Sequence, residues 1–181
     1  MTLVRIEMAG TAEDAVRRLL LGGVAGAYRL ATCILRDPVA AEDAVQEAAL
    51  RAWAQRRELR DADRVEAWFS RIVVNVCRAE LGRRSRGPVR VAPAVDSPTP
   101  EPWAPADDSW ESREEVTMAL ARLTADEQIV VAMRYGRDLT VPQIAERTGL
   151  REGTVKSRLH NAQQHLRAAF EAERRAGEVS R

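Results

Sequence analysis

Two groups of side chains in this 181-residue sequence have types and spacings that suit contact with nucleic acid. In the first group, Arg64, Arg71, Asn75 and Arg78 fall on one side of a helix at about 100° per residue. A guanidinium can hold a phosphate, and an amide can hydrogen-bond a base edge. The second group follows a glycine and comprises Arg151, Thr154, Lys156, Ser157, Arg158, His160 and Asn161. The alternative for both groups is an ordinary solvated helix surface.

Residue types that commonly perform catalysis or bind metals form no such pattern. His160 and His165 are five residues apart, not the four that place two ligands on one helix face. Cys33 and Cys77 each lie among apolar neighbours, which favours two buried thiols over a metal site. The sequence has neither a glycine-rich phosphate loop nor the motifs of a catalytic triad. We therefore expect a protein that is not an enzyme and has no cofactor and no metal.

The second group of polar residues belongs to a predicted helix-turn-helix between residues 140 and 166. Thr140 and Gln143 have the spacing of a capping box, which begins a short helix. Gly149 allows the left-handed turn that ends this helix and orients the next one. The inward positions of that next helix are Val155, Leu159, Ala162, Leu166 and Phe170. Its outward face would enter a DNA major groove, and a simple helical hairpin is the alternative.

The first group is positioned by three helices predicted in the N-terminal half. One spans about 11–36, where a cluster of glycines allows a break. A second spans about 38–57 and begins with Asp37 as N-cap and a proline at its first position. Its apolar stripe includes Trp53, whereas Leu50 falls on its polar face.

The third helix is predicted from Asp63 to Leu81-Gly82. Asp63 and Glu66 have the spacing of a capping box. The apolar stripe of this helix consists of Val65, Trp68, Phe69, Ile72, Val73 and Val76. Trp68 and Phe69 lie on this stripe, so core packing is favoured over stacking on bases. In the C-terminal half, two further capping boxes are predicted, at Ser112 to Glu115 and Thr124 to Glu127.

Composition and charge divide the chain into two domains. Good helix formers dominate and aromatic residues make up only 4%, which predicts an all-α protein. Six of the eight prolines lie between residues 83 and 108. Residues 83–90 carry a net charge of +4, and residues 91–120 carry −6. We predict two small helical domains, at 1–84 and 109–181, joined by a proline-rich acidic linker at 85–108, with the helix-turn-helix in the C-terminal domain.

The chain has no pattern that indicates a membrane or export. No stretch approaches the roughly 18 apolar residues that a membrane span needs. The N-terminus carries acidic residues early and lacks the design of a signal peptide. We expect a cytoplasmic protein with no membrane insertion of its own. The net charge of +1 does not by itself indicate a nucleic-acid partner.

Considered together, the two halves resemble the extracytoplasmic-function (ECF) sigma factors of bacterial RNA polymerase, in the sigma-70 superfamily. The resemblance covers about residues 11–170. In the first half it rests on YRLATCILRDPVAAEDAVQEAALRAW followed by VEAWFSRIVVNVCRAELGRR. In the second half it rests on LTADEQIVVAMRYGRDLTVPQIAERTGLREGTVKSRLHNAQQHLR. The second pattern alone occurs in other regulators, so the specificity comes from both runs in this order.

The resemblance implies a sigma factor that binds core RNA polymerase and directs it to promoters by recognising their −10 and −35 elements. It implies polymerase docking by Asp43, Gln46, Glu47, Leu50 and Arg51. It implies −10 binding by Arg64, Arg71, Asn75, Arg78, Arg83 and Arg84, and −35 binding by the second polar group defined above. Promoter DNA and an anti-sigma factor are the other partners that the resemblance implies.

Three alternatives remain at this stage. One is a DNA-binding output protein of a response regulator, and another is a sigma-like decoy that binds a regulator instead of DNA. The third is an enzyme whose site the sequence does not reveal. A decoy should lack the cationic side of residues 64–78 or the polar face of the last helix, and the sequence contains both.

Overall fold

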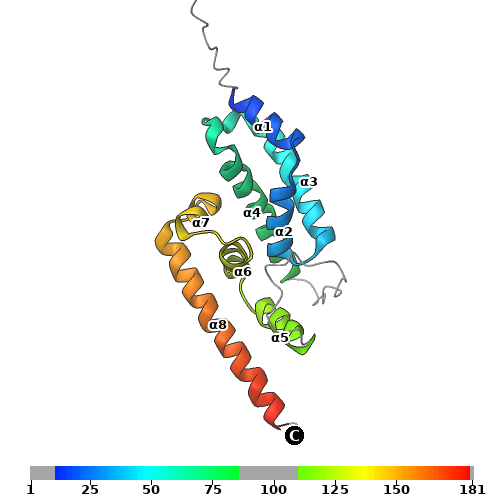
Figure 1. Ribbon diagram of the computed structural model, residues 1–181, viewed down its shortest axis with the longest axis vertical. Helices are drawn as coiled ribbons and strands as arrows, with labels where there is room; N and C mark the ends of the chain where they lie inside the picture. Colours follow the sequence, from blue (N-terminus) through cyan, green and yellow to red (C-terminus); the bar gives the residue numbers. More distant parts are fainter. Residues whose placement is uncertain (1–10, 86–109, 180–181) are drawn as a thin grey trace, which may run out of the picture.

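The computed structural model describes residues 11–85 and 110–179, and these ranges contain helices and no strand (Figure 1). The N-terminal helices are α1 (Ala12–Leu21), α2 (Ala25–Leu35), α3 (Pro38–Ala54), the short η1 (Arg56–Glu58) and η2 (Ala62–Arg64), and α4 (Val65–Arg84). The C-terminal helices are α5 (Trp110–Ala121), α6 (Ala125–Val131), η4 (Ala132–Gly136), α7 (Val141–Thr148) and α8 (Glu152–Val179). The predicted all-α fold is confirmed. Except for Ser85, the predicted linker at 85–108 lies outside the described residues.

The first predicted helix is two helices, because the chain breaks at its glycines. Thr11 and Asp14 form a capping box that begins α1. Gly22 ends α1, and Gly23 follows with a φ of 98°, a conformation that L side chains rarely adopt. The chain then turns into α2, which ends at Arg36 in the left-handed region.

Helix α3 begins as predicted and ends earlier than predicted. The Asp37 carboxylate accepts a hydrogen bond from the backbone N–H of Ala40 at 3.1 Å, and Pro38 occupies the first turn. The helix ends at Ala54 instead of near residue 57, and a short 3-10 turn follows. Trp53 was expected in the core, but it is 45% exposed and stacks on the guanidinium of Arg56.

The start of α4 corrects another prediction. Asp63 does not form a capping box with Glu66, because it is already inside the 3-10 turn η2. Asp61 caps that turn by accepting from the backbone N–H of Asp63 at 3.0 Å. The helix also continues past the predicted end at Leu81-Gly82, as far as Arg84. Phe69 is buried as predicted.

In the C-terminal helices, one predicted cap is wrong and two are confirmed. Ser112 lies inside α5, which begins two residues before it. Thr124 and Glu127 form the predicted capping box of α6. Gln143 accepts a hydrogen bond from the backbone N–H of Thr140 at 2.9 Å at the start of α7. Helix α6 continues as the π-helical turn η4, which contains Gly136.

The predicted helix-turn-helix consists of α7, a turn at Gly149 and α8. Gly149 has a φ of 73°, and its backbone N–H bonds to the carbonyl of Ala145. On α8, Val155 and Ala162 are buried as predicted. Phe170, which was expected to face inward, is 39% exposed, whereas its neighbour Ala169 is buried.

One apolar cluster joins the two halves of the chain. It contains buried residues of α2, α3 and α4 together with residues of α6, η4, α7 and α8. The contacts run from α4 to α6 and α7, and from α2 to η4, and Figure 1 shows α7 and α6 lying against the N-terminal helices. A smaller cluster around Leu120, Leu123 and Ala162 joins α5 to α8. Full burial stabilises a Val or Leu side chain by roughly 1.5–3 kcal/mol, so this shared cluster fixes the arrangement.

No single helix of the described ranges is long and apolar enough to cross a membrane. Helices α1 and α2 are together long and apolar enough, but they are bent by 72° at the break between them. Leu30, Ala31 and Ile34 of α2 are buried inside the helical bundle.

The conformation at Gly149 gives a test of the fold. Gly149→Ala should lower the free energy of unfolding by about 1–2 kcal/mol, because an L residue is strained at this φ. Its Cβ would also lie 3.2 Å from the Nε of Arg71. Urea denaturation followed by far-UV circular dichroism measures this loss. The matched control is Gly153→Ala in α8, whose Cβ meets nothing within 4 Å and should not destabilise the protein. Equal stabilities of the two variants would contradict the left-handed conformation at Gly149.

Candidate nucleic-acid interface

Four polar residues predicted to bind nucleic acid lie along one side of α4 and the turn before it. Arg64, Arg71 and Asn75 are exposed, and Arg78 is half-buried. The Oδ1 of Asn75 accepts a hydrogen bond from the Nη1 of Arg78 at 2.8 Å. The Nε of Arg64 lies 3.6 Å from a carboxylate oxygen of Asp61. The structure therefore brings these residues together as a row that runs beside the C-terminal helices.

Two arginines of this row contact the C-terminal helices directly. The Nη2 of Arg71 donates to the carbonyl of Glu146 in the last turn of α7 at 2.9 Å. This carbonyl lies at the negative end of the α7 dipole, which favours a cation. The Nε of Arg78 pairs with the Oδ1 of Asp126 in the first turn of α6 at 2.8 Å.

The other two arginines predicted to bind the −10 element lie apart from this row. Arg83 pairs with Glu80 on the same helix. Arg84 contacts Glu80, and its Nη2 lies 2.9 Å from the carboxylate of Asp37 at the start of α3. It also donates to the carbonyl of Leu35. Arg84 thus ties the end of α4 to the turn between α2 and α3.

On α8 the predicted polar face is largely exposed. Lys156, Ser157, His160 and Asn161 are exposed, and Arg151 precedes the helix on the same end. Thr154 is half-buried in the first turn. The backbone N–H groups of the residues at this helix end favour an anion.

Arg158 was predicted to belong to this polar face, but its side chain turns toward α6. Its Nη2 lies 2.7 Å from the Oδ2 of Asp126, so the two carboxylate oxygens of Asp126 hold one arginine from α8 and one from α4. The Nη1 of Arg158 is buried and has no hydrogen-bond partner among the described residues. Sequence reasoning missed Asp126, because no local signal connects it to Arg78, 48 residues away.

Helix α3 presents a third surface, with both apolar and charged residues. The residues predicted to dock polymerase are all exposed: Asp43, Gln46, Glu47, Leu50 and Arg51. Leu50 is 69% exposed, and Arg51 pairs with Glu47 at 2.8 Å. Val39 and Trp53 are also exposed on α3. The spacing from Val39 to Leu50 is about three helical turns, so these two side chains lie on the same face of the helix. Sequence reasoning missed Val39 and assigned Trp53 to the core, although their helical spacing with Leu50 was available.

Comparison with known proteins identifies the family. The family model for Sigma-70 region 2 matches residues 12–87, and the model for Sigma-70, region 4 matches residues 119–168. The ECF RNA polymerase sigma factor SigL of Mycobacterium tuberculosis is 36% identical over 173 residues, covering 93% of this chain and 97% of the relative. This chain belongs to the ECF sigma factors of the sigma-70 superfamily.

Other relatives of this ECF sigma factor agree in family and fold. The RNA polymerase sigma-E factor of Streptomyces coelicolor is 29% identical over 143 residues, covering 77% of this chain and 76% of the relative. A solved structure of the sigma factor RpoE in complex with the anti-sigma factor NepR from Bartonella quintana superposes with a TM-score of 0.59. It is 23% identical and covers 88% of this chain and 98% of that one, so it shows the shared fold.

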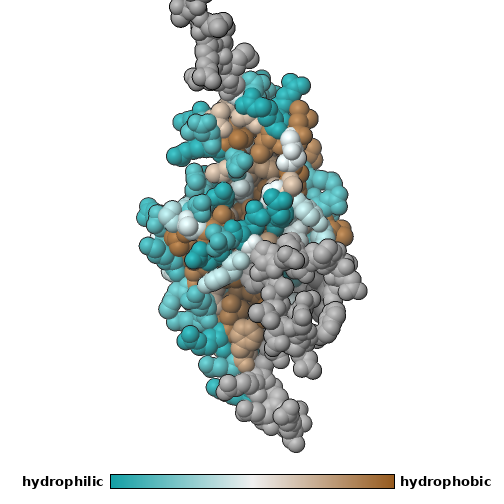
Figure 2. All heavy atoms as spheres, in the orientation of Figure 1, coloured by the Kyte–Doolittle hydropathy of each residue, from teal (hydrophilic) through white to brown (hydrophobic). Residues whose placement is uncertain are grey.

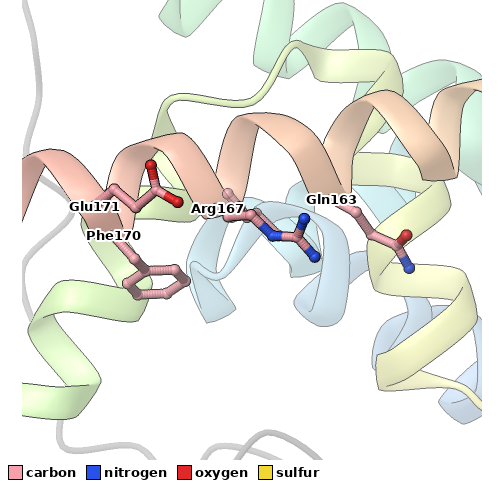
Figure 3. A pocket seen from close by; sticks show the side chains of 5 residues that line it. Gln163, Arg167, Phe170 and Glu171 are labelled. Carbon is pink, nitrogen blue, oxygen red and sulfur yellow. The ribbon is translucent and has the colours of Figure 1, made fainter.

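The ECF sigma factor also has a groove on α8, C-terminal to the exposed polar residues between 156 and 161. It is lined by Gln163, Leu166, Arg167, Phe170 and Glu171. Figure 3 shows the Phe170 ring projecting from α8 on the side of α5, and Figure 2 shows apolar surface beside α8 in the lower half of the molecule. The amide of Gln163 donates to the Tyr135 hydroxyl at 3.0 Å and closes one end of the groove.

Glu127, beside Asp126 in α6, gives a pH test of how the sigma factor's C-terminal helices are held. Burial raises the pKa of Glu127, but hydrogen bonds from Thr124 and His165 outweigh it and hold the pKa below its usual value. A depressed pKa stabilises the fold above the unfolded pKa of about 4.3, and this contribution is lost as pH falls through the lower folded pKa.

Glu127→Gln should therefore lower the free energy of unfolding by roughly 1 kcal/mol at pH 6 and by much less at pH 3. Denaturation curves at the two pH values measure the difference. The exposed Glu171→Gln on α8 is the control and should have little effect at either pH. A pH-independent effect of Glu127→Gln would contradict this account.

Proposed function

We propose that this ECF sigma factor binds core RNA polymerase and directs it to promoters by contacting the −10 and −35 elements with separate helices. The observation that carries the proposal is the pair of polar and cationic surfaces on α4 and α8, in a chain matched by both sigma-70 regions. The protein is then a cytoplasmic initiation factor and has no catalytic role of its own.

For the −10 element, the proposed contacts are the row on α4. Arg64, Arg71 and Arg78 hold phosphates of the non-template strand, and Asn75 hydrogen-bonds a base edge. A base captured by this domain must leave the stack, which costs a few kcal/mol and is offset by the new contacts. Arg83 and Arg84 are proposed as further −10 contacts at the end of α4, where both pair with Glu80.

For the −35 element, the proposed contacts are on the first turns of α8. Ser157, His160 and Asn161 face the base edges in the major groove, while Arg151 and Lys156 hold the phosphates on either side. Thr154 adds a contact at the helix N-terminus. Arg158 joins them when it leaves Asp126.

Docking on core polymerase is proposed for α3. Leu50 supplies a large exposed apolar side chain, and Asp43, Gln46, Glu47 and Arg51 surround it with polar contacts. Such an apolar centre with a polar rim is the usual arrangement of a protein interface. The similar sigma factor RpoE of Bartonella quintana was solved in complex with the anti-sigma factor NepR, and we propose that an anti-sigma factor likewise competes for the surfaces of this chain.

Run-off transcription with purified core enzyme and a library of genomic fragments tests the proposed function. We expect defined start sites only when this protein is present, and co-purification of the protein with core. Core enzyme that gains no start site from the uninhibited protein would refute the proposal.

Docking through α3 predicts a strong effect of one substitution. Leu50→Asp should weaken the binding of core polymerase more than about tenfold, because a charge replaces the apolar centre of the interface. Fluorescence anisotropy with labelled sigma factor measures this affinity. The matched control is Leu21→Asp at the end of α1, another exposed leucine, which should bind core normally. Equal affinities of the two variants would exclude α3 as the docking helix.

The two kinds of contact proposed for α8 predict different effects on promoter binding by the holoenzyme. Lys156→Ala should weaken binding to all promoters alike and reduce the slope of log K against log salt by about 1, because one phosphate contact is lost. Asn161→Ala should cost about 1–3 kcal/mol on the preferred −35 sequence only. Filter binding over a salt series and a −35 library separates the two. Arg175→Ala, an exposed cation farther along α8, is the control; the same change in slope there would reject a phosphate role for Lys156.

A further inference from the structure

One of the two ring nitrogens of His160 on α8 is held by another side chain of the same helix. The Nε2 of His160 lies 2.9 Å from the amide nitrogen of Gln164, which is one helical turn further along. Both side chains are exposed, and helical spacing places them on the outward face of α8 together with Ser157 and Asn161. The pair therefore lies within the surface proposed to contact the −35 element.

This contact decides which nitrogen of the imidazole ring carries the proton. The amide nitrogen of Gln164 has two N–H donors and no acceptor. The Nε2 of His160 must therefore accept the hydrogen bond through its lone pair, and in the neutral ring the proton lies on Nδ1. An imidazole without such a partner exchanges between its two tautomers, so that either nitrogen can donate or accept. Gln164 thus makes the Nδ1 of His160 a fixed donor.

The Nδ1–H of His160 is available to a ligand outside the protein. No residue within 11–85 or 110–179 forms a hydrogen bond with it, and the ring is exposed. The neighbouring Ser157 is committed in the opposite sense, because its hydroxyl donates to the backbone carbonyl of Thr154 at 3.0 Å and leaves its oxygen as an acceptor. The hydrogen bonds within α8 therefore give these two positions different polarity.

We propose that Gln164 is a positioning residue for promoter recognition, which holds His160 as a hydrogen-bond donor and so makes it select a base that presents an acceptor in the major groove. Guanine presents two acceptors there and thymine one, whereas cytosine presents only an amine donor. His160 then favours guanine or thymine over cytosine at one position of the −35 element. The inference rests on the proposed function, because it takes His160 as a base contact.

Selection from a promoter library by the holoenzyme tests this inference. The holoenzyme is assembled from core polymerase and the full-length protein, and the library randomises the −35 element of duplex promoter DNA. We expect the wild type to favour guanine or thymine over cytosine at one position, and His160→Ala to lose the preference at that position. The His160→Ala variant therefore identifies the base that His160 contacts.

Gln164→Leu keeps the approximate size of the side chain and removes the donor. At the position identified by His160→Ala, the ratio of guanine or thymine to cytosine should fall about fivefold, the factor that one neutral hydrogen bond supplies. Gln164→Lys should restore the ratio, because an ammonium group can only donate. The matched control is Gln163→Leu, which removes an amide that bonds the Tyr135 hydroxyl instead of His160 and should leave the ratio unchanged.

Nitrogen NMR on the free protein reads the tautomer without DNA. The chain has two histidines, and long-range correlations between ring protons and nitrogens report which nitrogen is protonated. At about pH 8, above the ordinary pKa of histidine, the proton of His160 should lie on Nδ1 in the wild type and be shared between both nitrogens in Gln164→Leu. The signals of His165, which contacts Glu127, should be the same in both proteins. Circular dichroism checks that each variant is folded.

The inference is overturned if Gln164→Leu leaves the base ratio or the tautomer of His160 as in the wild type. It is also overturned if the wild type prefers cytosine at the His160 position, or if Gln164→Lys changes the preferred base, since Gln164 would then contact the base itself. A holoenzyme whose −35 preferences do not respond to His160→Ala would refute the proposed −35 contact, and the inference with it. Failure of the Gln164 variants alone refutes only the inference.

Discussion

The structure depends on the burial of α4 over a wide arc of its surface. Helices α2 and α3 pack against α4, and five of its buried side chains are Phe69, Ile72, Val74, Val76 and Cys77. With α6 and α7 also packed on this helix, only a narrow side remains for polar residues. The arginines and Asn75 occupy that side, so the same helix carries the shared core and the proposed −10 contacts.

This crowding explains why Arg71 and Arg78, which are proposed for −10 contact, also bind the C-terminal helices. Each is close enough to the C-terminal helices to bind a carbonyl or a carboxylate there, and each remains accessible to solvent. Partly exposed ion pairs contribute about 0–1 kcal/mol, so phosphates can replace these partners at small cost. The apolar cluster, and not the ion pairs, supplies most of the free energy that holds the halves together.

The sequence was informative where a signal is local and less so where a partner is distant. The capping box at Thr124 and the left-handed turn at Gly149 depend on residues within one turn, and both were predicted correctly. Trp53 was misplaced because an apolar stripe on a helix does not reveal how much of it a neighbour covers. The pairing of Arg158 with Asp126 could not be predicted, because it depends on the packing of α8 against α6.

The proposed contact surfaces differ in whether a side chain must first leave a partner within the protein. Contacts through Leu50 on α3 or Asn161 on α8 leave the packing of α4 unchanged, because both side chains already face solvent. Contacts through Arg78 require it to leave Asp126 first. Arg158 on α8 is held by the same carboxylate, so its proposed −35 contact also requires release from Asp126. The docking proposed for α3 and the duplex contacts proposed for Ser157, His160 and Asn161 need no such release, because these side chains already face solvent.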